Sequence, residues 1–252
     1  MLKAMEEINV KLGVKTILSR IEEACNRRKP ELQGVSPQLV AVSKTKPVSM
    51  IIEAYEAGQR HFGENYVGEL VEKASNAEIL EKCKEIRWHF IGNLQTNKVN
   101  KVLSIPNLYL IETVDDEKLA SKINSGWSKY CREKNKLKVM IQVNTSGEDA
   151  KNGTNPDNVV TLSKFVIEKC ENLCFDGLMT IGQFGYDLSQ GPNPDFLLLS
   201  KCKDDVCTNL GLEWKSVGLS MGMSDDFEHA IELGSTNVRV GSSIFGHRVK
   251  KV

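Results

Sequence analysis

Eight short apolar segments, spaced along the chain with helical stretches between them, constrain most strongly what this sequence can fold into. Each segment is rich in Val, Ile, Leu or Phe and stays apolar instead of alternating with polar residues, which is typical of strands buried on both faces of a parallel sheet. The segments cover residues 39–43, 60–63, 88–91, 108–114, 137–143, 175–181, 214–219 and 237–241.

Apolar residues recur at helical spacing in the stretches between these segments. The predicted helices cover residues 50–57, 66–74, 116–130, 159–168, 196–210 and 227–233. Eight such units favour a closed (β/α)8 barrel, the TIM barrel of the α/β class, over a doubly wound open sheet, which has fewer strands and a glycine-rich first turn. Residues 4–28 predict an additional N-terminal helix outside the barrel. We therefore expect a single domain over residues 1–252.

The composition excludes several classes of partner. Lysine plus arginine and aspartate plus glutamate number 33 each, so the chain has no basic field that would collect nucleic acid. A run of about 18 apolar residues and a secretory signal are both missing, so we expect a cytoplasmic protein without a membrane partner. The seven cysteines lack the close spacing of a zinc site, and we expect reduced thiols and no metal.

In a barrel of this kind, the residues that carry chemistry follow the carboxyl ends of the strands. After the first strand, a period of two places Lys44 on the same face as Val40 and Val42. If that face is the barrel interior, the amine points into a dry pocket, where a lysine becomes a nucleophile toward an aldehyde. Spacing alone leaves open that Lys44 and Lys46 are both solvated residues of the rim.

The loops after the seventh and eighth strands are the common phosphate site of such barrels. Their small residues let backbone N–H groups and hydroxyls approach an anion, and Ser220, Gly241 and Ser242 are the candidates. Ser224 or Asp225 is predicted to cap the next helix, whose acidic first turn would repel a phosphate.

Arg239 lies in the eighth strand, where a buried cation needs an acceptor. That acceptor is either a pyridine nitrogen or a barrel carboxylate such as Glu64. His61 and His89 are interpreted as hydrogen-bonded core residues, since no two histidines have the spacing of metal ligands. The glycine- and proline-rich loop of residues 182–195 is predicted to lie on the same rim and to cover the site.

These motifs together resemble the pyridoxal phosphate homeostasis protein family, whose barrel is similar to the N-terminal domain of alanine racemase. The resemblance covers the barrel from first strand to last, through residues 41–47 (AVSKTKP), 61–66 (HFGENY), 88–98 (WHFIGNLQTNK), 177–181 (GLMTI), 220–224 (SMGMS) and 239–246 (RVGSSIFG). It departs from the family at Gly68, where glutamine is frequent, and at Leu197, where an arginine often follows the aromatic residue. Both departures concern the rim.

The resemblance implies a site for pyridoxal 5′-phosphate (PLP) and a role in supplying or buffering this form of vitamin B6. Lys44 is then expected to form a Schiff base with the cofactor. The resemblance further implies that Ser220, Gly241 and Ser242 hold the phosphate, that Arg239 faces the pyridine nitrogen, and that Asn65 and Met221 lie against the cofactor.

Two functions of different classes compete at this point. Racemisation needs a base on each face of the substrate carbanion, and in alanine racemase the second base is a tyrosine reached with an additional C-terminal domain and a partner subunit. This chain stops six residues after Gly246, and Tyr66 is the rim tyrosine with a claim to that role. We therefore expect a monomeric PLP carrier without catalytic residues, with PLP-dependent apo-enzymes as candidate recipients. A barrel for another phosphate compound is the third alternative.

Overall fold

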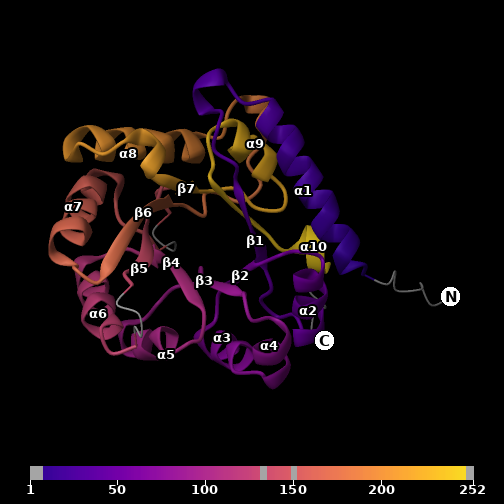
Figure 1. The fold of residues 1–252 in the computed structure, drawn as a ribbon. Helices are drawn as coiled ribbons and strands as arrows, with labels where there is room; N and C mark the ends of the chain where they lie inside the picture. Colours follow the sequence, from indigo (N-terminus) through magenta and orange to yellow (C-terminus); the bar gives the residue numbers. More distant parts are fainter. Residues whose placement is uncertain (1–7, 131–134, 149–151, 248–252) are drawn as a thin grey trace.

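The computed structural model describes residues 8–130, 135–148 and 152–247, and its eight strands close into a barrel (Figure 1). The strands are β1 (Gln38–Val42), β2 (His61–Glu64), β3 (Arg87–Phe90), β4 (Leu108–Val114), β5 (Leu137–Gln142), β6 (Leu173–Met179), β7 (Gly218–Ser220) and β8 (Asn237–Val240). All neighbours pair in parallel and in chain order, and β1 closes the barrel against β8. The predicted TIM barrel is confirmed.

The helices surround this barrel (Figure 1). They are α1 (Val10–Asn26), α2 (Val48–Glu56), α3 (Val67–Ala74), α4 (Ala77–Lys82), α5 (Val99–Leu103), α6 (Glu117–Trp127), α7 (Val159–Lys169), α8 (Pro194–Leu210), α9 (Phe227–Glu232) and α10 (Ser242–Phe245). The sequence did not predict the short helices α4, α5 and α10.

Successive residues of β1 face opposite sides of the sheet. Leu39 and Ala41 belong to the core between barrel and helices. Val40 faces the interior, because a Cβ atom added to Gly63 of β2 would lie 3.0 Å from its side chain and 3.0 Å from that of Ile91. The interior face of β1 therefore carries Val40 and then Val42, as the period of two predicts.

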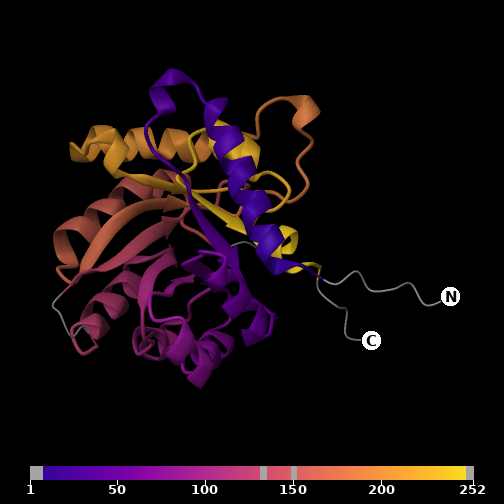
Figure 2. The same ribbon diagram turned by 45° about the vertical axis from the view of Figure 1, so that its right-hand side comes forward.

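Helix α1 packs on the outside of the barrel against α2, α9 and α10 (Figure 2). Its buried face consists of Val10, Val14, Ile17, Ile21 and Ala24. Beyond its end, the buried Arg28 donates hydrogen bonds to the carbonyl oxygens of Ile231 and Val35 at 2.8 and 2.5 Å. The predicted additional helix is confirmed from Val10 onward, and residues 4–7 of that prediction lie outside the described residues.

The predicted strand at residues 214–219 begins too early. Trp214–Ser216 forms a 3₁₀ turn, and β7 starts at Gly218. Trp214 packs on α8 instead of in the sheet, because its Nε1 donates to Asp204 at 2.7 Å and its ring covers the Nζ of Lys203 at 3.3 Å from the centroid. The hydrophobicity of Trp214 therefore predicts a strand residue, although the side chain packs against a helix.

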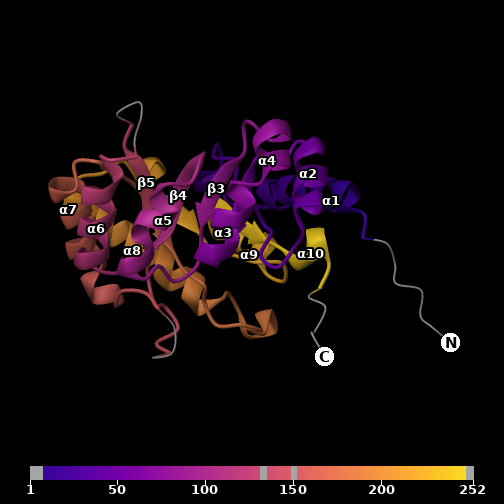
Figure 3. The same ribbon diagram turned by 90° about the horizontal axis from the view of Figure 1, so that it is seen from below.

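The loop of residues 182–195 lies at the carboxyl ends of the strands, on the side of α10 (Figure 3). Both ends are fixed, since the N–H of Gln183 donates to Asp195 at 2.6 Å and the N–H of Asn193 donates to His229 at 3.1 Å. Between these anchors, the side chain of Phe184 is 78% exposed. The loop therefore shares the rim with the other βα loops, as predicted.

We expect Gly177→Ala to lower the free energy of unfolding by about 2 kcal/mol or more. Gly177 has φ of 141°, and an added Cβ would lie 2.1 Å from the carbonyl oxygen of Gly218 on β7. Gly68→Ala on α3 is the control, because its Cβ meets no atom within 4 Å and should raise the same quantity by about 0.5–1 kcal/mol. Urea denaturation measures both, and a Gly177→Ala protein as stable as the wild type would contradict this close approach of β6 and β7.

Candidate functional site

A cavity of about 760 Å³ opens at the carboxyl ends of the strands. Its apolar wall consists of Val42, Ile91, Met179, Ile181, Phe184 and Met223, and its polar wall includes Lys44, Asn65, Ser224, Asp225, Arg239, Gly241 and Ser242. An apolar pocket with a few convergent polar groups is the usual form of a small-molecule site. Its place on the barrel agrees with the rim predicted from the sequence.

The two lysines after β1 have different surroundings. Lys44 is half-buried and lines the cavity beside Val42, which agrees with the predicted interior face. The Nζ of Lys46 donates to the carbonyl oxygens of Phe245 and Gly246 at 2.7 and 2.8 Å, and to that of His247 at 3.2 Å. Lys46 thus ties this loop to the end of α10.

The loop that carries Lys44 is held from behind by α3. The buried Nζ of Lys73 donates at 2.7 Å to the carbonyl oxygen of Ser43, to Glu64 and to Glu69. Glu69 also accepts the N–H of Thr45, whose φ of 64° is unusual for a residue other than glycine. Lys73 thus fixes the direction in which the chain leaves β1.

Arg239 projects from β8 into the same cavity and is almost fully buried. Its Nη1 donates to Ser220 Oγ at 2.6 Å and its Nη2 donates to the carbonyl oxygen of Thr180 at 2.6 Å. Burial lowers the pKa of Arg239, and the negative charge of Glu112 opposes that effect. The alternative partner considered from the sequence, Glu64, pairs with Lys73 instead.

The loop after β7 differs from its prediction. The cap of α9 is Asp226, whose carboxylate accepts the N–H of Met223 at 2.6 Å, so neither Ser224 nor Asp225 caps that helix. Ser224 turns its hydroxyl toward β8, where it accepts the N–H of Gly241 at 3.2 Å. Ser224 thus joins Gly241 and Ser242 in one wall of the cavity. Sequence reasoning set it aside because of the acidic residues that follow.

Asn65 has a side-chain oxygen that accepts no hydrogen bond from any other described residue. Its Oδ1 is buried without a hydrogen-bond partner among the described residues, and the side chain lines the cavity. The backbone of Asn65 is closely packed, because a Cβ on Gly92 would lie 1.9 Å from its carbonyl oxygen. Buried acceptors are nearly always paired, so this atom points to a ligand with a donor group.

The comparisons with known proteins agree with this geometry. The profile of the family described as alanine racemase, N-terminal domain, matches residues 18–249. A relative from Homo sapiens named pyridoxal phosphate homeostasis protein is 54% identical over 242 residues, which cover 96% of this chain and 88% of that protein. This chain belongs to the pyridoxal phosphate homeostasis protein family.

Two solved structures extend the family comparison. The structure of an unknown protein from Bifidobacterium adolescentis superposes with a TM-score of 0.80 and 33% identity, over 94% of both chains. PipY of Synechococcus elongatus, solved with PLP bound, superposes with a TM-score of 0.71 and 28% identity, over 91% of this chain and 100% of PipY.

Five of the seven contacts that the family resemblance predicts line the cavity: Lys44, Asn65, Arg239, Gly241 and Ser242. The other two lie behind its wall. Ser220 is fully buried and contacts Arg239, and Met221 is buried in the core outside the barrel. A direct contact of Ser220 or Met221 with the cofactor stays a prediction.

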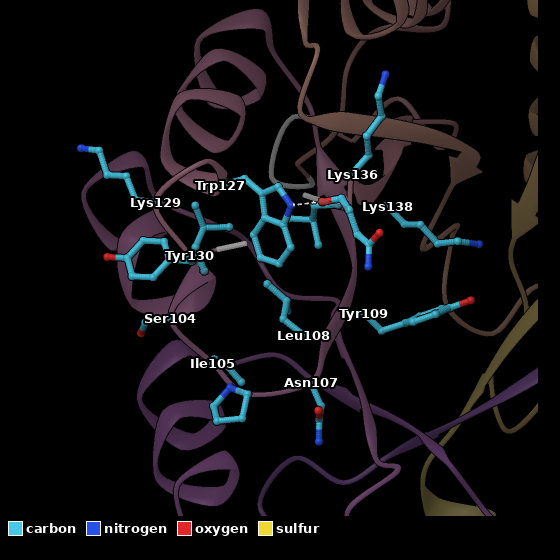
Figure 4. A pocket seen from close by; sticks show the side chains of 14 residues that line it. Ser104, Ile105, Asn107, Leu108, Tyr109, Trp127, Lys129, Tyr130, Lys136 and Lys138 are labelled. Carbon is cyan, nitrogen blue, oxygen red and sulfur yellow. Dashed lines mark hydrogen bonds between the residues drawn. The ribbon is translucent and has the colours of Figure 1, made fainter. Parts of the chain in front are cut away.

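A second cavity, of about 790 Å³, lies at the opposite end of the strands, where β4 and β5 begin (Figure 4). Trp127 forms part of its wall and donates from Nε1 to the carbonyl oxygen of Asn135 at 2.7 Å. Lys138 also lines it, and its ammonium group pairs with Asp176 at 2.7 Å. None of the residues predicted for the family site lies here.

His61 and His89 are buried and hydrogen-bonded to each other at 2.8 Å between Nδ1 and Nε2. Burial, together with the charges of His89 and Arg87, lowers the pKa of His61 to about 3. The interpretation as core histidines is confirmed. Within the described part of the chain, no three His, Cys, Asp or Glu side chains form a group that could hold a metal.

We expect His61 to make stability depend on pH. Its pKa is about 3 in the folded protein and about 6.5 when unfolded, so its stabilising effect is complete above pH 6.5 and is lost as the pH falls toward 3. Between pH 7 and pH 5 the wild type should lose about 2 kcal/mol more than His61→Asn in urea denaturation. Equal losses in the two proteins would show that His61 titrates normally.

Proposed function

We propose that this chain binds PLP as a Schiff base on Lys44 and carries or buffers the cofactor in vitamin B6 homeostasis, without catalysing a reaction of its own. The observation that carries the proposal is one cavity lined by Lys44, Arg239 and the Gly241–Ser242 turn. PLP has an aldehyde, a pyridine nitrogen and a phosphate, and this cavity offers a group suited to each. The names of the human relative and of PipY with PLP bound support the same cofactor.

Lys44 is our candidate for the covalent contact. A neutral amine adds to the aldehyde carbon, a C=N bond replaces the C=O bond, and the oxygen leaves as water. Lys46 also lines the cavity, and its Nζ donates to three carbonyl oxygens at the end of α10. The clamp formed by Lys73, Glu64 and Glu69 holds the backbone on both sides of Lys44.

The phosphate is assigned to Gly241, Ser242 and Ser224. These residues bring hydroxyls and backbone N–H groups to one wall of the cavity, and small residues of this kind let an anion approach closely. Asp225 also lines the cavity and limits where a dianion can lie. Asn65 Oδ1, buried without a partner among the described residues, fits a donor on the cofactor.

Arg239 is suited to a pyridine nitrogen that stays unprotonated. Arginine has donors and no acceptor, so it leaves a facing pyridine nitrogen unprotonated and weakens PLP as an electron sink. The exposed Phe184 and Ile181 at the cavity mouth leave room for exchange of the cofactor. No helix among the described residues has the length and apolarity needed to span a membrane. A cytoplasmic location, a monomeric state and PLP-dependent apo-enzymes as recipients stay predictions.

Addition of PLP to the purified protein should give a visible absorbance band that borohydride reduction fixes on Lys44. Lys44→Ala should abolish the band and keep the fold, because a rim lysine contributes little to the packed core. Lys46→Ala is the matched control and should keep the band. Peptide mass spectrometry identifies the labelled lysine, and a label on Lys46 would overturn the assignment. Turnover of an alanine enantiomer by the wild type, lost in Lys44→Ala, would support the racemase instead.

Ser224→Ala should weaken PLP binding by about tenfold, since a hydrogen bond to a charged group is lost. Binding of pyridoxal, which has no phosphate, should stay unchanged in the same variant. Ser243→Ala is the control, because Ser243 is exposed on α10 and does not line the cavity. Absorbance titration gives both dissociation constants. Equal weakening for PLP and pyridoxal would show that Ser224 does not contact the phosphate.

A further inference from the structure

We propose that Glu112, in the middle of β4, is a positioning residue that holds the guanidinium group of Arg239 in the cofactor cavity by way of Ser220. The inference rests on the proposed function, because it explains how the group assigned to the pyridine nitrogen is kept in place. Glu112 does not line the cavity and is fully buried inside the barrel.

A continuous chain of hydrogen bonds leads from Arg239 to the other end of the barrel. Ser220 Oγ lies 2.6 Å from Arg239 Nη1 and 2.5 Å from Glu112 Oε2. The second oxygen of Glu112 lies 2.7 Å from His89 Nδ1. His89 Nε2 then contacts His61 Nδ1 at 2.8 Å, and His61 Nε2 contacts Arg87 at 3.3 Å. Five different strands contribute to this chain, β2, β3, β4, β7 and β8.

The two arginines determine the direction of every bond in this chain. Arginine only donates, so Arg87 makes His61 Nε2 an acceptor, and the proton of His61 is then on Nδ1. His61 donates to His89, and His89 in turn donates from Nδ1 to Glu112. At the other end, Arg239 donates to Ser220, whose hydroxyl proton goes to Glu112. All donors therefore converge on one carboxylate, which has a separate oxygen for each half of the chain.

The charge of Glu112 makes this arrangement strong. Burial alone raises the pKa of a carboxyl group, but the hydrogen bond from His89 and the charge of Arg239 hold the pKa of Glu112 below its ordinary value. The ionised carboxylate compensates the buried guanidinium of Arg239, a compensation that a buried cation requires. Asp226, the N-cap residue of α9, is the second acidic group whose charge acts on Arg239.

The far end of the chain is closed by aromatic and basic groups. The ring of Tyr109 packs edge-on against His61 at 5.0 Å, and Arg87 and Lys138 lie over it at 5.2 Å from its centroid. Figure 4 shows Tyr109 and Lys138 pointing to the same side of the second cavity. Burial lowers the pKa of His61 and the charges of Arg87 and Lys138 lower it further, so His61 stays neutral and donates toward Glu112. The series of hydrogen bonds is therefore fixed at both ends. Arg239 is the end that lies in the cofactor cavity.

A double-mutant cycle on PLP affinity tests the proposal. Glu112→Gln keeps the shape but leaves one oxygen for two donors, and we expect the PLP dissociation constant to rise about tenfold. In an Arg239→Gln background, the same substitution should change the constant by less than about twofold, because Glu112 acts through Arg239. Borohydride should still label Lys44 in all four proteins.

Ser220→Ala removes the bridge and leaves the carboxylate, so it should reproduce the effect and its dependence on Arg239. It also serves if Glu112→Gln does not fold. Ser163→Ala is the matched control, because Ser163 is fully buried on α7 with no hydrogen-bond partner among the described residues, and it should leave PLP affinity unchanged. Wild-type affinity in Ser220→Ala, or equal effects with and without Arg239, would overturn the positioning role. A wild type without a PLP absorbance band would instead contradict the proposed function itself.

Discussion

The pairing of β1 with β8 is the contact on which the candidate site depends. It places Val40 beside Arg239 and Ala41 beside Val240, so the segments that follow the two strands leave the barrel next to each other. Gly241 lies so close to β1 that an added Cβ would be 3.2 Å from the carbonyl oxygen of Val42. A lysine near the start of the chain and a Gly-Ser turn near its end thus share one cavity. An open sheet with the same strands would separate them.

Two buried charge clusters hold the groups that this pairing brings together. On the outer side, Lys73 of α3 pairs with Glu64 and Glu69 and fixes the loop that carries Lys44. On the inner side, Glu112 is linked to Arg239 through Ser220. In each cluster a buried charge is compensated by an opposite charge and by hydrogen bonds, without which burial would be costly. The cavity is therefore lined by a rigid set of polar groups.

The same rigidity bears on what the proposed carrier can do. The guanidinium group of Arg239 is held by Ser220 and the carbonyl oxygen of Thr180, and it keeps further N–H donors for the proposed ring nitrogen. A ring nitrogen that only accepts a hydrogen bond stays unprotonated, which would make PLP a weak electron sink in the proposed carrier. Arg239 in the polar wall is buried, whereas Phe184 and Ile181 at the mouth are exposed. In the proposed carrier, such a site would combine a firm hold on the cofactor with an open route for its exchange.

The sequence by itself determined the class of fold, because continuously apolar strands and helical periods are local properties. Alternation along the first strand also placed Lys44 on the face of Val40 and Val42, but it left open whether that face lines a pocket or leaves the lysine in solvent. The tertiary structure alone tied Lys46 to the end of α10, placed Ser224 and not Ser220 in the cavity wall, and joined Glu112 to a serine 108 residues away. Hydrogen-bond partners of this kind meet only when the barrel closes, and no local pattern of residues records which ones meet.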